Sequence, residues 1–287
     1  MPPTIVRPRC VEEALAFNVG RESISIDTST IVEVHPFDAW TAAPPSLPSI
    51  DDYISRVYLI TIPAAQVQNI HKTCRHLSIT FTGLLHSLTI IYHSGALDEA
   101  HGFKAVTPYS MRRFTKLSDD EIACHISYIT SDWKKPLISA ARTVAEGSKE
   151  EENLISKTSQ ISQIYQTALS AEFSVVPQRG PSALIELSKV KDFGDLCEDE
   201  MKRKRGYTYE LSNIGVVQLP DDSPGNVRLE KLVFSQCAMV AGPAIGFTVI
   251  SLKEGPFAIT LSWQERILEN EFREGMGIYL NRRLLIL

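Results

Sequence analysis

The sequence has few features that would link it to a metal, an oxidising compartment or a membrane. No C-x-x-C spacing occurs, so neither a zinc site nor a disulfide framework is indicated, and no metal is expected. The cysteines are odd in number and widely scattered: Cys10, Cys74, Cys124, Cys197 and Cys237. A reducing, cytoplasmic location is therefore expected. A membrane span needs a run of about 18 apolar residues, and neither such a run nor the apolar core of a secretory signal is found.

An excess of positive charge is also absent. The net charge is −5, so no basic field attracts nucleic acid, and no nucleic-acid partner is expected. The chain is 44% hydrophobic and 22% charged, which is the composition of an ordinary globular protein. Its 287 residues allow one large or two ordinary domains.

The hydrophobic pattern divides the chain near residue 50. Residues 1–50 are poorly patterned and end in a proline-rich stretch, which predicts an N-terminal segment and linker. Residues 51–287 carry a clear mixture of strand and helix signals, which predicts an α/β (α+β) lobe with a mixed or largely antiparallel sheet. Strands are predicted near 55–62, 104–110, 122–130, 207–218, 244–253 and 257–264.

Helical spacing and capping residues occupy the stretches between these strands. Pro63 opens one helix, and a second is predicted between an N-cap at Thr80 and a C-cap at Gly95. Further helices are predicted over 134–170 with a break near its centre, over roughly 182–205, and over 269–287. The basic residues at 202–205 are interpreted as a solvated helix end.

An ordered set of motifs gives the chain a family likeness. The segments are "HKTCRHLSITFTGLLHSLTIIY", "VTPYSMRRF", "YELSNIGVV", "VFSQCAMVAGPAIGFTVIS" and "FAITLSWQE". In this order they resemble the C-terminal half of fungal alcohol O-acetyltransferases, in the chloramphenicol-acetyltransferase-like superfamily, over residues 50–285. The most specific parts are 212–215, 234–236 and 261–264.

This resemblance implies a two-lobed fold in which each lobe is a sheet packed by helices. The family transfers acetyl from acetyl-CoA to an alcohol, so acetyl-CoA is expected as a co-substrate and no bound cofactor is expected. Both substrates enter a tunnel between the lobes. A histidine in an H-x-x-x-D motif of the N-terminal lobe takes the proton of the attacking hydroxyl, because a neutral alcohol is a poor nucleophile. By analogy, the alcohol is expected to be a small secondary metabolite.

The catalytic motif itself is missing from this sequence. Four residues rather than three separate His93 from Asp98, and this stretch is interpreted as a helix end and solvated turn. His35 and Asp38 are one residue too close. The sequence therefore predicts one lobe of a two-lobed enzyme that is poorly active alone. Three origins stay open: a remnant, a truncated gene model, or a fragment that works differently. A non-catalytic binding module and a subunit that needs a protein partner are the alternatives, and a large exposed apolar face is expected.

Several residues are candidates for the site. Ser212 and Asn213 interrupt an apolar strand, so they either bond to a neighbouring loop or line the tunnel for substrate and CoA. Ser235 and Gln236 have the same two interpretations. The resemblance implies that an arginine at Arg112 or its neighbour holds the catalytic loop, the alternative being a surface position.

Two further features have structural interpretations. Trp263 is expected to pack in the core or at the lobe interface. The D-F-G-D sequence at 192–195 is interpreted as a chance match within a helix, because no other kinase motif accompanies it.

Overall fold

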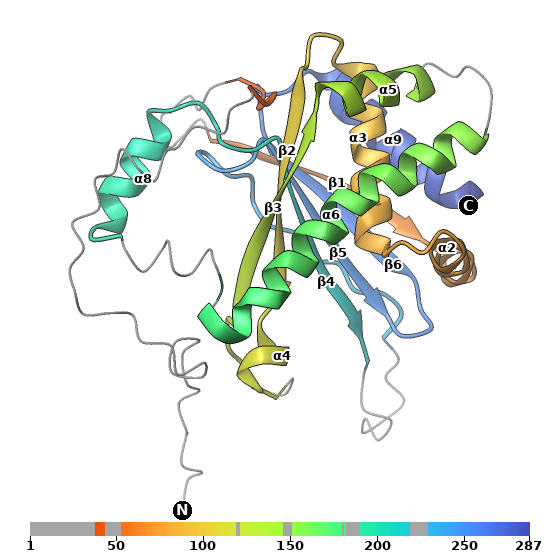
Figure 1. Ribbon diagram of the computed structural model, residues 1–287, viewed down its shortest axis with the longest axis horizontal. Coiled ribbons are helices and arrows are strands. Elements are labelled where there is room, and N and C mark those ends of the chain that lie inside the picture. Colours follow the sequence, from red (N-terminus) through yellow and green to blue (C-terminus); the bar gives the residue numbers. More distant parts are fainter. Residues whose placement is uncertain are drawn as a thin grey trace, which may run out of the picture.

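The computed structural model describes the following residues: 38–43, 53–118, 121–145, 151–179, 181, 190–218 and 229–287. In these ranges the chain forms one six-stranded sheet, in the order β1-β6-β5-β4-β2-β3, with helices packed against one face (Figure 1). The strands are β1 (Ser55–Ile62), β2 (Gly102–Ser110), β3 (Ile126–Lys134), β4 (Tyr209–Val217), β5 (Ile245–Leu252) and β6 (Phe257–Gln264).

The sheet is mixed, as the sequence predicts. β4 runs parallel to both β2 and β5, whereas the β1–β6, β5–β6 and β2–β3 pairs are antiparallel. All six predicted strands are present. The prediction at 122–130 is displaced, because the strand begins at Ile126. The preceding residues form a loop instead, with the carbonyls of Glu121 and Ala123 accepting hydrogen bonds from Arg112.

The described helices are α2 (Ala64–His76), α3 (Phe81–Ala96), α4 (Arg112–Thr115), α5 (Lys135–Ala145), α6 (Glu151–Arg179), α8 (Phe193–Met201) and α9 (Asn270–Ile286). The N-cap prediction for α3 is confirmed, because the Thr80 hydroxyl accepts a hydrogen bond from the Gly83 amide at 3.0 Å. Its C-cap is Leu97 rather than Gly95.

The helix predicted over 182–205 is shorter than expected. Residues 182–189 lie outside the described ranges, and α8 begins after Asp192, whose side chain accepts from the amides of Gly194 and Asp195. The D-F-G-D sequence is thus a helix N-terminus and not mid-helix. The interpretation of 202–205 as solvated is wrong for Arg205, which is buried.

The main core lies between the sheet and the helices α3, α5, α6 and α9. Alternate residues of each strand point to this face, so one side of the sheet is apolar. Its largest fully buried side chains include Trp133, Tyr209, Phe103, Ile62 and Leu211. Part of the predicted linker contributes as well: the Trp40 ring contacts His93 and Phe272, and its amide donates to the Gly102 carbonyl.

The opposite face of the sheet carries no helix within the described residues (Figure 1). We call it the helix-free face. Residues 229–243, which have no helix or strand, cross it and are named the covering segment. No helix in the described ranges is long and apolar enough to cross a membrane.

Candidate functional site

A row of polar side chains crosses the helix-free face over three neighbouring strands. Because Tyr209 and Leu211 point into the core, the residues that alternate with them point to the helix-free side. Strand register then places Ser212 opposite Thr248, and Thr248 opposite Thr260. We call this row the polar stripe; its members are Glu210, Ser212, Thr248, Thr260, Ser262 and Gln264.

The covering segment is held on the polar stripe by hydrogen bonds. The hydroxyls of Thr248 and Thr260 both donate to the Phe234 carbonyl, at 2.6 and 2.9 Å. On the neighbouring edge strand, the Ser55 hydroxyl accepts from the Ala238 amide at 2.9 Å. Both threonines are buried in consequence. Short hydroxyl side chains under an irregular segment form a polar layer, in contrast to the apolar layer on the other side of the sheet.

Arg205 fixes the far end of the covering segment. Its guanidinium donates to the carbonyls of Met239 and Gly242 at 2.8 and 2.9 Å, and to the Gln264 side chain at 3.1 Å. Burial lowers the pKa of Arg205. The guanidinium therefore joins the segment to β6 and is not available as a surface charge.

Glu210 is one of the site residues that the sequence analysis missed. It is 8% exposed, and burial raises the pKa of its carboxyl, while a hydrogen bond with the Gln236 side chain acts in the opposite direction. The Gln236 Oε1 atom is buried and has no partner among the described residues. A carboxylate alternating with apolar residues, two positions before Ser212, is the signal that could have revealed it.

Ser212 and Asn213 point to opposite faces. The Asn213 amide donates to the Thr82 hydroxyl at 3.1 Å on the helix side, and its oxygen accepts from the Gly215 amide at 2.9 Å. The strand has a β-bulge here, and Gly215 adopts a φ of 92°. The S-N-I-G motif thus encodes a bulge that only glycine accommodates without strain, with Ser212 alone on the polar stripe.

Of the other two predicted tunnel residues, only one contacts the polar stripe. Gln236 reaches the polar stripe through Glu210, whereas Ser235 is exposed and its hydroxyl donates to the Gln236 carbonyl at 3.2 Å. Trp263 packs in the core on the helix side, with the Arg273 guanidinium 5.4 Å from its ring centre. Of the four predicted tunnel residues, Ser212 is a member of the polar stripe and Gln236 contacts it through Glu210.

Arg112 is hydrogen-bonded to carbonyls of the residues that precede β3. It donates to the Glu121 and Ala123 carbonyls at 2.8 and 3.2 Å and also bonds the Ser118 carbonyl. Its neighbour Arg113 stacks on the Phe173 ring at 4.6 Å. Neither arginine reaches the polar stripe through these contacts.

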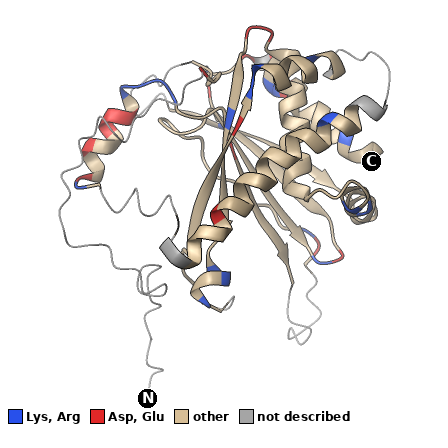
Figure 2. Cartoon of the chain, in the orientation of Figure 1, with Lys and Arg blue, Asp and Glu red and all other residues tan. Residues whose placement is uncertain are grey.

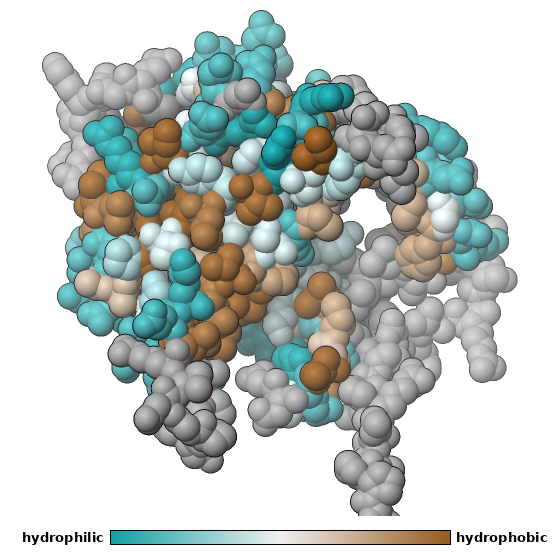
Figure 3. All heavy atoms as spheres, turned by 180° about the vertical axis from the view of Figure 1, so that it is seen from behind, coloured by the Kyte–Doolittle hydropathy of each residue, from teal (hydrophilic) through white to brown (hydrophobic). Residues whose placement is uncertain are grey.

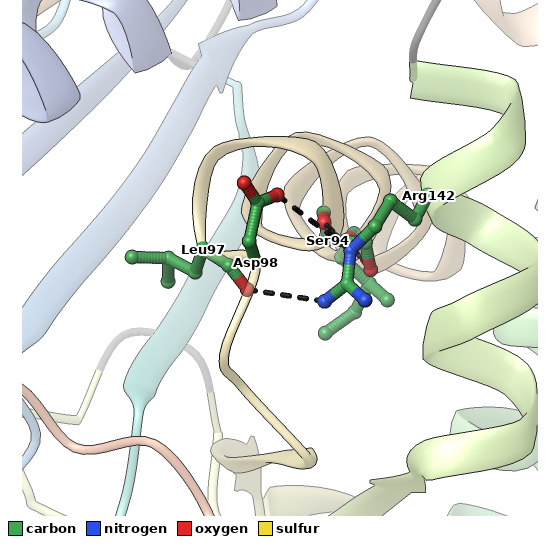
Figure 4. A network of polar contacts seen from close by, with 5 residues as sticks. Ser94, Leu97, Asp98 and Arg142 are labelled. Atoms are coloured by element: carbon green, nitrogen blue, oxygen red, sulfur yellow. Dashed lines mark hydrogen bonds and ion pairs between the residues drawn. The ribbon is translucent and has the colours of Figure 1, made fainter.

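The H-S-G-A-L-D stretch is only partly a solvated turn. Asp98 is exposed and lies 3.9 Å from Arg142, which also donates to the Ser94 and Leu97 carbonyls (Figure 4). His93 is fully buried, so its assignment to solvent is wrong. Its Nδ1 donates to the Thr89 carbonyl at 2.7 Å, and burial lowers its pKa to about 4.

Two other histidines are also buried. His86 bonds the Tyr209 hydroxyl through Nδ1 at 2.8 Å and the Thr107 hydroxyl through Nε2 at 3.1 Å, and burial lowers its pKa to about 3. His125 contacts the Thr115 hydroxyl at 3.0 Å and lies just before β3 instead of within a strand. These histidines serve packing and hydrogen bonding away from the polar stripe. No cluster of side chains placed to hold a metal ion occurs among the described residues.

Sequence comparison decides the family. The profile of the family described as "Alcohol acetyltransferase" matches residues 18–281. The chain belongs to the alcohol acetyltransferase family. A probable alcohol acetyltransferase of Fusarium pseudograminearum, FCK4, is 25% identical over 277 residues, covering 94% of this chain and 53% of that protein. An uncharacterized Schizosaccharomyces pombe protein is 22% identical over 73% of this chain and 44% of its own length. The alcohol acetyltransferase-like chain thus spans about half the length of the curated relatives it matches.

Solved structures confirm the expected fold, a mixed sheet packed by helices. The trichothecene 15-O-acetyltransferase TRI3 of Fusarium sporotrichioides has a TM-score of 0.61 at 10% identity, over 86% of this chain and 49% of that one. The epimerization domain of tyrocidine synthetase B has a TM-score of 0.52 at 11% identity, over 96% and 55%. At these identities the likeness concerns the fold of the alcohol acetyltransferase family member and not its substrate.

Proposed function

We propose that this chain forms one lobe of an acetyl-CoA-dependent alcohol O-acetyltransferase acting on a small alcohol of secondary metabolism. Its helix-free face would form one wall of the site. The observation that carries this proposal is the polar stripe, which includes Ser212 and crosses β4, β5 and β6 beneath the covering segment. Family membership supports the reaction type.

The reaction transfers acetyl from the CoA sulfur to the alcohol oxygen. The C–S bond breaks, an ester C–O bond forms, and the hydroxyl proton must leave for the thiolate to depart protonated. This sequence contains no H-x-x-x-D motif to take that proton. We therefore assign binding and orientation of the substrates to this lobe, and assign the general base to a second lobe that faces it.

An apolar rim supports the idea of a facing lobe. Val57 and Leu59 of edge strand β1 point to the helix-free side and are 51% and 45% exposed. Val233 and Phe234 of the covering segment are also exposed. Hydrophobic side chains gather on this face (Figure 3), and contiguous exposed apolar surface usually marks an interface. We call these four residues the apolar rim and propose that they contact the second lobe or a protein partner.

A second candidate function is a non-catalytic binding subunit. The burial of His86 and His93 favours it, because neither imidazole can act as a base on a substrate at the helix-free face. Such a subunit would retain ligand binding at the polar stripe and would contribute no chemistry.

Hydrogen exchange of the full chain with and without acetyl-CoA tests the leading proposal. We expect protection of the covering segment and of β4, β5 and β6, and no change in α5. A Ser212→Val variant should weaken this protection, whereas Ser235→Val, which changes an exposed serine nearby, should not. Protection confined to the helices, or none at millimolar acetyl-CoA, would contradict the proposal that this face binds the co-substrate.

A further inference from the structure

Glu210 is unusual for its position in the sheet. Strands β4, β5 and β6 contain a single charged residue, and it is Glu210. Figure 2 shows the charged residues concentrated elsewhere, notably on α8 and in connecting loops. A buried carboxylate costs several kcal/mol unless a cation or several hydrogen-bond donors compensate it. A strand position that served packing alone would favour an apolar side chain.

Two buried basic residues, Lys104 and Arg205, interact with groups other than this carboxyl. Lys104 lies over the Tyr207 ring at 5.0 Å and stands opposite Asp132 on β3. Arg205 is engaged with two carbonyls and with Gln264. The protein partner found for Glu210 is the Gln236 amide. A carboxylate accepts several hydrogen bonds, so it retains capacity for a ligand.

The groups around Glu210 are suited to hydroxyl ligands. The opposing residue on β5 is Gly246, which has no side chain, and the Ser262 hydroxyl lies close above it, 2.7 Å from where a Cβ would stand. The Gln236 Oε1 atom is buried without a partner among the described residues. The Glu210 carboxyl, which accepts from Gln236 and can accept further hydrogen bonds, and the unpartnered Gln236 oxygen thus belong to the same part of the polar stripe as Ser212 and Ser262.

We propose that Glu210 and Gln236 bind a second hydroxyl of the acceptor, so that the substrate is a diol or larger polyol and not an aliphatic monoalcohol. This inference rests on the proposed function. The carboxylate of Glu210 and the Gln236 oxygen accept hydrogen bonds from the ligand. A monoalcohol bound in the same place leaves these buried acceptors unpaired, and a site built to bond a hydroxyl discriminates strongly against an analogue that lacks it.

A ligand titration of the full chain by NMR tests the proposal. The probes are 1,2-butanediol and 1-butanol, which differ by one hydroxyl, observed through side-chain carboxyl and backbone shifts. We expect saturable shifts at residues 210 and 236 with the diol, and at least about tenfold weaker binding of 1-butanol, as one lost hydrogen bond to a charged group predicts. Glu210→Gln should reduce this preference and Glu210→Leu should abolish it. Glu274→Gln, on the exposed face of α9, is the matched control and should leave it unchanged.

Equal binding of the two alcohols, absence of saturable shifts with the diol, or an unchanged preference in Glu210→Leu would overturn the inference. Circular dichroism checks that each variant folds. If one of the two Glu210 variants does not fold, the other, which differs from it in polarity, still tests the inference. Acetyl-CoA is titrated into the same samples. Diol preference without acetyl-CoA binding contradicts the proposed function alone, whereas acetyl-CoA binding without diol preference contradicts only this inference.

Discussion

On strands β4, β5 and β6 the two faces of the sheet differ in polarity, whereas edge strand β1 has apolar residues on both faces. On the helix-covered face, Trp133, Tyr209 and Phe103 pack against α3 and α6. On the helix-free face, hydroxyls and one carboxyl lie beneath a segment that is held by hydrogen bonds to its carbonyls. The first face supplies hydrophobic stabilisation. The second has a polar layer that contributes little net stability, which is the arrangement expected of a binding surface.

Removing a large side chain from each face should show this contrast most clearly. Trp133 stacks on Tyr209 and donates to the Ile161 carbonyl at 3.3 Å. Trp133→Ala should lower the free energy of unfolding by about 3–5 kcal/mol, because it removes a buried aromatic ring. Leu59→Ala on the helix-free side is the control and should cost less than about 1 kcal/mol. Urea denaturation measures both, and similar losses would refute the contrast.

The next effect is a pH dependence that comes from the covered face. The pKa of His93 is about 4 in the folded chain and near 6.5 unfolded, so the unfolded state binds more protons between these values. The stabilisation is complete above pH 6.5 and is lost as the pH falls toward 4, by roughly 3 kcal/mol in total.

Urea denaturation at pH values from 7 to 4.5 checks this expectation. The profile of His93→Leu should be flatter than that of the native chain, whereas the profile of His76→Leu, which changes an exposed histidine of α2, should match it. Identical slopes in all three proteins would show that His93 is not buried in its neutral form.

A smaller effect is expected at the bulge of β4, which lies between Asn213 and Gly215. Gly215→Ala places a Cβ at a φ of 92° and should cost about 1–3 kcal/mol of stability. Gly206→Ala is the matched control, since open space surrounds its Cβ position and its φ is not in the left-handed region; its cost should be within about 0.5 kcal/mol. Thermal unfolding measures the stability of both variants. Equal stabilities of the Gly215→Ala and Gly206→Ala proteins would mean that a side chain at position 215 does not strain the bulge.

Much of the fold could be predicted from residue patterns. The apolar–polar alternation in "FAITLSWQE" predicted β6 at 257–264, and the N-cap residue Thr80 predicted the start of α3. The parallel pairing of β4 with β2 and β5 could not be predicted, because partners far apart in sequence leave no local signal. For the same reason the burial of His93 was missed: its neighbours Trp40, Phe103 and Phe272 come from three distant segments.

The candidate site was only partly predictable. Polar residues in an apolar strand drew attention to Ser212, but period-two alternation does not reveal which face a helix covers, so Asn213 was grouped with it. Arg205 was assigned to solvent because acidic and basic residues surround it in sequence. Its real partners are carbonyls of the covering segment more than 30 positions away.

We propose that this chain supplies a binding wall and not the general base. Acetyl transfer from acetyl-CoA to a panel of small alcohols and diols, measured with the purified chain alone, tests it most directly. We expect a rate lower by about 10²–10⁴-fold than that of a family enzyme with the H-x-x-x-D motif, because positioned base catalysis is missing. Robust turnover by the chain alone, lost in His93→Ala or His125→Ala, would contradict it.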